Sequence, residues 1–128
     1  MQKWLVMAAL GVCLPFAAQA ATPLDKEAAI KLFTDHTFDG VFVPKDKRFQ
    51  AYEAPDGSHI VLRPNGKRDK GRVWSINDQG QHCTTSPKNA DKLRCSSVLD
   101  MGGGVYHKVN AKGKHTHTLT NFRPGNQL

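Results

Sequence analysis

Three short turns with one shared residue pattern constrain the fold of this chain more than any other feature of its sequence. Each has glycine in its fourth place; they are Ala54-Pro55-Asp56-Gly57, Asn77-Asp78-Gln79-Gly80 and Asn110-Ala111-Lys112-Gly113. Two begin with asparagine, and the other has proline second. These are the preferences of a type I turn followed by a left-handed glycine, which joins two antiparallel strands. The sequence therefore predicts three β-hairpins.

The segments beside these turns are rich in β-branched and aromatic residues, as strands are. With two further segments of the same kind they give eight predicted strands, at 37–43, 49–53, 58–63, 72–76, 81–85, 92–99, 105–109 and 114–122. No linker or change of composition divides them, so residues 21–128 are expected to form one domain. The predicted fold is mainly β: a short N-terminal helix, then an antiparallel meander of about eight strands curled into a small barrel or half-barrel, which removes exposed strand edges.

Helical signals occur just before the meander. Thr22-Pro23 offers an N-cap followed by proline at the first helical position, and Asp25 and Glu27 suit the positive end of the helix dipole. Apolar residues then recur at helical spacing, at Leu24, Ala28 and Leu32. We expect this helix to end at Asp35-His36.

Residues 1–20 have the pattern of a signal peptide. Lys3 precedes an apolar run over residues 4–16, and Ala18-Gln19-Ala20 gives the small-x-small motif that signal peptidase cleaves. The sequence therefore predicts a periplasmic or secreted protein, cleaved after Ala20. The alternative is a lipid anchor at Cys13, but Val12 is bulky where a lipoprotein box has a small residue.

Export leaves two cysteines, Cys83 and Cys95, in an oxidising compartment. If Asn77 pairs with Gln81, then Ser75 faces Cys83, and Trp74, Ile76, His82 and Thr84 share the opposite side. On the next strand Cys95 stands two positions from Leu93 and shares its face, so Cys95 can meet Cys83 across the sheet. We expect a structural disulfide; two free buried thiols are the alternative.

The first hairpin places Tyr52 opposite Ile60 and Glu53 opposite His59. A glutamate beside a histidine suits acid–base chemistry. A pair of charges directly across two strands is more often a solvated surface pair, and we interpret Glu53 and His59 as an exposed ion pair.

The last hairpin carries three histidines. If Val109 pairs with His115, then His107 pairs with His117, and the three imidazoles lie on one face, as zinc or copper ligands would. Against a metal site, no carboxylate in these two strands can orient the rings, and a slip of one residue would turn His107 to the other face. Surface histidines are the preferred interpretation.

Taken together, the run 52–57, the run Gly71-Arg72-Val73-Trp74-Ser75-Ile76, the two cysteines and the closing Phe122-Arg123-Pro124-Gly125-Asn126 resemble a group of small exported bacterial proteins. These are lipocalin-like, single-domain proteins of unknown function, including those grouped as DUF995. The resemblance implies a small periplasmic barrel or half-barrel, and it implies no activity. The chain is short for a full lipocalin calyx and lacks the usual Gly-x-Trp near the first strand.

No catalytic motif is present, so the sequence predicts a protein that is not an enzyme. Its formal net charge is +7. Because an exported chain rarely meets nucleic acid, we interpret the charge as an ordinary basic surface. The alternative is a surface that attracts an anionic component of the envelope or a protein partner.

Two function classes remain. A non-catalytic binding module would have a cavity, for which the candidate lining residues are Phe38, Phe42, Tyr52 and Trp74. A structural or stress-related envelope protein would act through protein contacts, with a filled core and a flat apolar patch. Barrels of this size are usually filled by their own side chains.

Overall fold

The computed structural model describes residues 21–86 and 88–128. The predicted signal peptide, with Cys13 and the cleavage after Ala20, lies outside the described residues. The elements are, in chain order, β1 (Thr22–Pro23), α1 (Lys26–Phe33), β2 (His36–Phe42), the 3₁₀ turn η1 (Val43–Lys45), β3 (Lys47–Glu53), β4 (Ser58–Leu62), β5 (Arg68–Ile76), β6 (His82–Ser86), β7 (Asn89–Asp100), β8 (Tyr106–Val109) and β9 (His115–Pro124). No helix in this described part is long and apolar enough to cross a membrane.

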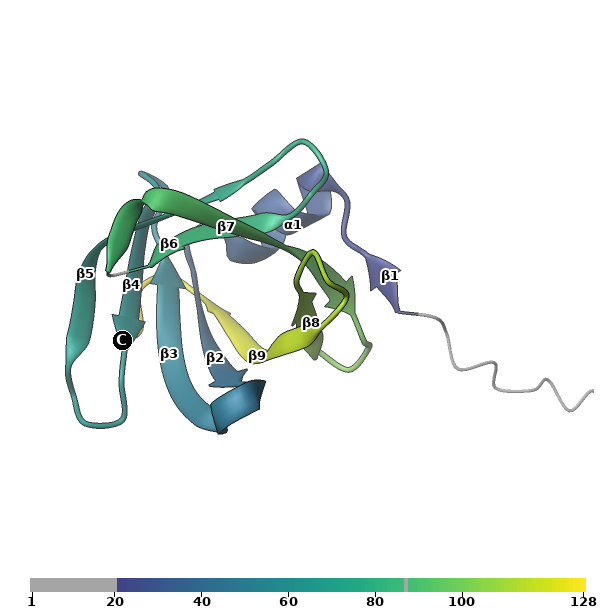
Figure 1. Cartoon of the computed structure of the whole chain (residues 1–128). Coiled ribbons are helices and arrows are strands. Elements are labelled where there is room, and N and C mark those ends of the chain that lie inside the picture. Colours follow the sequence, from purple (N-terminus) through teal and green to yellow (C-terminus); the bar gives the residue numbers. More distant parts are fainter. Residues whose placement is uncertain (1–20, 87) are drawn as a thin grey trace, which may run out of the picture.

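Strands β2 to β9 form a closed antiparallel barrel. Each pairs with the next along the chain, and β9 returns to pair with β2 (Figure 1). The short strand β1 pairs with β7 outside this circuit, through Thr22 opposite Asp100 and Pro23 opposite Leu99. The predicted mainly β meander is therefore confirmed, and it closes fully into a barrel.

All three predicted hairpin turns are present. In each, the fourth-place glycine has a positive φ and donates its N–H to the first residue's carbonyl oxygen, over 2.9 to 3.0 Å. Arg63-Pro64-Asn65-Gly66 forms a fourth turn of the same kind, with an N–O distance of 2.9 Å. It also has proline second and glycine fourth, so the same residue pattern identifies it.

The helix begins later than the sequence predicts. Asp25 is its N-cap, accepting a hydrogen bond from the Ala28 N–H at 2.8 Å. Thr22-Pro23 is strand β1, and the Leu24 N–H donates to the Val98 carbonyl oxygen at 2.8 Å. Because this segment is bonded to β7 in an extended conformation, the helix starts only beyond it.

Helix α1 closes one end of the barrel. Its last residue, Phe33, is fully buried against the rings of Phe38, Phe122 and His82, with centroids 5.7, 5.6 and 4.1 Å away. The β5–β6 turn packs against the start of the helix, where a Cβ on Gly80 would overlap the backbone of Leu24. Figure 1 shows α1 away from the β2–β3 connection and the β4–β5 turn, which lie at the other end.

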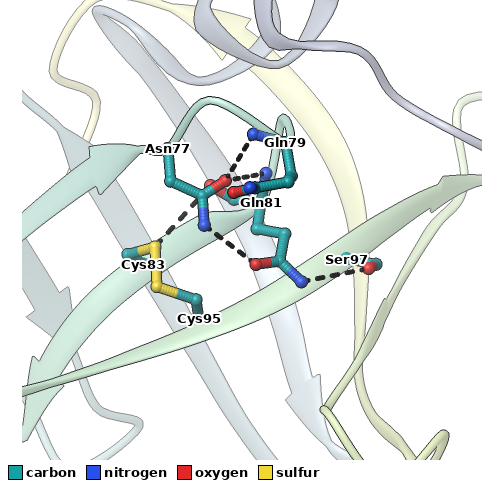
Figure 2. The surroundings of a disulfide bond; sticks show 6 residues. All are labelled: Asn77, Gln79, Gln81, Cys83, Cys95 and Ser97. Atoms are coloured by element: carbon teal, nitrogen blue, oxygen red, sulfur yellow. Dashed lines mark hydrogen bonds between the residues drawn. A yellow bond between two sulfur atoms is a disulfide. The ribbon is translucent and has the colours of Figure 1, made fainter.

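Cys83 and Cys95 are disulfide-bonded, as predicted. They are direct partners across β6 and β7, with Cα atoms 4.0 Å apart. Figure 2 shows the adjacent turn, where the Asn77 Oδ1 accepts from the N–H groups of Gln79 and Gln81 at 3.1 and 2.9 Å. The bond lies on the face opposite His82 and Thr84, as the predicted register requires.

Candidate ligand-binding cavity

The end of the barrel away from α1 contains a cavity of about 1360 Å³ that is open to solvent. Its apolar walls come from β2, β3, β4 and β9, through Phe38, Phe42, Phe49, Val61 and Leu119. Cavities of a few hundred to ~1,000 Å³ hold small molecules in other proteins. The sequence leaves open whether the barrel has a cavity, and the structure has one at this end of the molecule.

Gly40 on β2 is one reason for the open interior, and it lies opposite Phe49 on β3. A Cβ at residue 40 would overlap the Phe49 ring. The missing side chain lets the ring lie against the barrel wall, which leaves the lumen free.

Two of the four predicted lining residues face the cavity. Phe38 and Phe42 line it, but Tyr52 and Trp74 do not. The Tyr52 hydroxyl donates to the Asp35 carboxylate at 2.6 Å, and this hydrogen bond raises the pKa of Tyr52 to about 12. Trp74 faces inward but packs towards the closed end, where its indole N–H donates to the Ala54 carbonyl oxygen at 2.8 Å.

Glu53 is fully buried between two histidines. One carboxylate oxygen accepts from His59 Nδ1 and the other accepts from His82 Nε2, the latter at 2.9 Å. Burial alone would raise the pKa of Glu53, but the electrostatic attraction of His59 and the hydrogen bonds from both histidines outweigh it and lower the pKa to about 2.

The interpretation of Glu53 and His59 as an exposed pair is therefore wrong, although their predicted register is confirmed. Phe49, Ala51 and Glu53 stand at every second position of β3 and share its inner face. Glu53 therefore points into the barrel, where its second partner comes from β6. The sequence places His82 on the same side as Trp74 and Ile76, but it does not show that Glu53 points towards that side.

His82 is buried beneath the Phe33 ring, and burial together with the charge of Lys108 lowers its pKa to about 4. The ring is thus neutral near pH 7. Since Nε2 donates to Glu53, Nδ1 carries a lone pair. Among the residues that the structure describes, this Nδ1 is the buried side-chain polar atom that lacks a hydrogen-bond partner.

A β-bulge changes the register of the last hairpin. Val109 pairs with His115 as predicted, but the register shifts between Lys108 and Val109. His107 therefore pairs with Thr118, and Lys108 takes the place opposite His117. The predicted pairing of His107 with His117 is wrong.

The bulge also separates the three histidines. The rings of His107 and His115 stack on each other with centroids 3.8 Å apart, whereas His117 lines the cavity. Over residues 21–86 and 88–128, no group of three or more His, Cys, Asp or Glu side chains is placed to hold a metal ion. The structure does not assemble the zinc or copper ligands that the sequence suggests.

Lys108 lines the cavity, but only 7% of its surface is exposed. No side chain or carbonyl in the described part of the chain accepts a hydrogen bond from its amine. Burial lowers the pKa of Lys108 to about 8, against the opposing attraction of Glu53. Sequence reasoning misses this residue, because without the bulge Lys108 would face outward.

The imidazole of neighbouring His117 is neutral near pH 7, like that of His82. Burial, and then the charge of Lys108, lower its pKa to about 3. Its ring lies near those of Phe42 and Phe49, with centroids 5.2 and 6.0 Å away. This part of the cavity therefore combines one buried amine, one neutral imidazole and two aromatic rings.

The remaining lining is strongly basic. Among the described residues, the cavity is lined by eight lysines and arginines against two aspartates, Asp46 and Asp69. Asp69 is already engaged by Arg63 at 2.8 Å, and Arg72 Nε donates to the Thr85 carbonyl oxygen at 2.7 Å. The exposed cations at the mouth that form no ion pair within the described chain are Lys47, Arg48, Lys92, Arg94 and Lys112. Such a lining produces a positive potential that attracts anions.

A scan of family models and searches of curated proteins and of solved structures find no match for this chain. The resemblance to lipocalin-like exported proteins therefore stays a prediction. The cavity and its charges are the observations on which a functional proposal can rest.

Proposed function

We propose that this protein is an exported, non-catalytic binding module whose barrel holds a small acidic molecule with an apolar body. The observation that carries the proposal is a cavity of about 1360 Å³ lined by Lys108, a largely buried lysine whose amine has no acceptor within the described chain. Burying a cation without a partner is costly, and an anionic ligand would supply that partner.

The lining matches the two halves of such a ligand. Aromatic and aliphatic side chains on β2, β3, β4 and β9 offer an apolar surface to its body. The exposed cations at the mouth attract its charge over a range set by the ionic strength. The predicted export, and the predicted resemblance to lipocalin-like periplasmic proteins, support a ligand from the cell envelope.

The alternative function, a structural or stress-related protein acting through protein contacts, has weaker support. The large apolar residues that are most exposed come from separate elements; they are Ile30, Val43, Val73, Leu93 and Met101. A recessed cavity with a charged lining is typical of small-molecule binding rather than of a flat contact surface.

Calorimetric titration of the mature protein, residues 21–128, tests the proposal. The probes are 2-naphthoate and 2-naphthylmethanol, which share an aromatic body and differ in charge. We expect saturable binding of one naphthoate, with the alcohol weaker by about tenfold, the equivalent of one modest ion pair. Equal binding of both probes, or of neither, would contradict the proposal.

A further inference from the structure

We infer that Lys108 and His117 together form the subsite for the ligand's acidic group, and that this group is a carboxylate. The inference rests on the proposed function and deepens it, because it names the residues and the chemical class. It starts from the bulged hairpin, which places these two side chains directly opposite each other on the inner faces of β8 and β9.

Direct cross-strand partners have Cβ atoms about 5 Å apart, so two such side chains can reach the two oxygens of one carboxylate. The Lys108 amine has no acceptor in the described chain. His117 Nδ1 lies 2.8 Å from the Thr116 hydroxyl. The same hydroxyl lies 3.4 Å from the Lys108 carbonyl oxygen, so its one proton has two possible acceptors. When the proton goes to the closer Nδ1, the neutral ring carries its own proton on Nε2, which becomes a second donor.

The surroundings favour a carboxylate that continues into an apolar body. The rings of Phe42 and Phe49 lie beside His117, and Leu119 follows two residues later on the same face of β9. Only 7% of the Lys108 surface is exposed beside these side chains, so little water reaches its amine. A charge-assisted hydrogen bond is stronger there than in a solvated position.

The charge balance favours a single negative charge. Of the cations that line the cavity, Lys108 is the largely buried one whose amine has no acceptor among the described residues, while Arg63 and Arg72 contact Asp69 and Thr85. Glu53 adds a fixed negative charge close enough to act on Lys108. A phosphate monoester carries about −1.5 to −2 at pH 7, which one buried amine would leave uncompensated.

Binding should take up a proton in mildly alkaline solution. The groups that act electrostatically at the subsite are Glu53 on β3, Arg72 on β5, His82 on β6, and His115 and His117 on β9. In the free protein the pKa of Lys108 is about 8. A bound carboxylate stabilises the ammonium and raises that pKa, so the affinity is full below pH 8 and falls as the pH rises above it.

The experiment compares 2-naphthoate with 2-naphthyl phosphate at pH 7, and 2-naphthoate at pH 7 with pH 9, by calorimetry. The variant is Lys108→Met, and the matched control is Lys31→Met, which removes the same charge from the exposed surface of α1. We expect Lys108→Met to weaken naphthoate binding about tenfold or more and to remove the loss between pH 7 and pH 9, while Lys31→Met changes neither. Phosphate should bind no more tightly than carboxylate.

A second measurement uses the unaltered protein, so that a poorly folded variant leaves the inference testable. Lysine labelled with ¹³C at Cε reports the pKa of each amine by NMR. Naphthoate should raise the pKa of the buried Lys108 and leave the pKa of the exposed lysines unchanged. If naphthoate binds the Lys108→Met variant with unchanged affinity and leaves the pKa of Lys108 unchanged in the unaltered protein, the subsite is wrong and the proposed function stands. Tighter binding of the phosphate would overturn the carboxylate assignment, and no binding of any probe would overturn the proposed function itself.

Discussion

Gly40 leaves the room that the Phe49 ring occupies, and this single contact helps to keep the barrel open. We predict that Gly40→Ala lowers the free energy of unfolding by about 1–3 kcal/mol, the usual cost of overpacking, because the ring must turn into the lumen. Urea denaturation measures the change. Adding Phe49→Leu should recover part of the loss, since leucine has no ring to displace; equal stability of Gly40→Ala and the unaltered protein would contradict the close packing.

Glu53 depends on its charge, because both of its oxygens accept hydrogen bonds from imidazoles. Glutamine has the same shape, but its amide nitrogen would face an N–H donor. We predict that Glu53→Gln costs about 3 kcal/mol of stability, in the range for removing one member of a buried charged group. The control is Glu27→Gln on the exposed first turn of α1, which should cost well under 1 kcal/mol; similar losses in both variants would count against the buried cluster.

At the scale of elements, local sequence determines most of the fold. Turn residues mark the hairpins, and alternation sets two registers correctly, since Tyr52 faces Ile60 and Trp74 faces Thr84. These features are predictable because a glycine-ended turn fixes which residues pair.

The candidate site is much less predictable. The bulge beside Val109 has no glycine or proline to mark it, and it exchanges His107 for Lys108 on the inner face. Likewise, Glu53 is buried because His82 reaches it from a strand 29 positions further along the chain. Both depend on closure of the barrel, which brings distant strands together and which no local pattern encodes.

The disulfide joins β6 and β7 across a direct pair, with Cys83 fully buried, and we expect its contribution to be to stability. We predict that the double variant Cys83→Ser, Cys95→Ser melts several degrees lower or more, from a bond worth ~2–4 kcal/mol in a domain of this size. Ligand binding at low temperature should persist. Unchanged melting, or two free thiols titrated in the unfolded, unreduced protein, would show that the bond has no structural role.

The whole molecule should lose stability in acid. The pKa of His82 and the pKa of His117 are lowered to about 4 and about 3, from 6.5. Between pH 6.5 and these lowered pKa values, the unfolded chain binds more protons than the folded one. The free energy of unfolding therefore falls as the pH drops from about 6.5. The pKa of Glu53, lowered from 4.5 to about 2, extends the loss below pH 4.5.

Urea midpoints at pH 7, 6, 5 and 4 measure this loss. His117→Phe should flatten the slope, because phenylalanine fills the same aromatic surroundings and takes up no proton. A midpoint that stays constant from pH 7 to pH 4 would contradict the burial of these imidazoles.

The molecule as a whole is a barrel with one end closed by α1 and the other end open and basic. The measurement that tests this most directly is an NMR titration of ¹⁵N-labelled mature protein with 2-naphthoate. The predicted result is saturable shifts centred on the amides of the inward-facing residues Phe42, Phe49, Lys108, His117 and Leu119, with the closed end beside α1 unchanged. Shifts confined to the outer face, or no saturable shift at all, would contradict a ligand-binding interior.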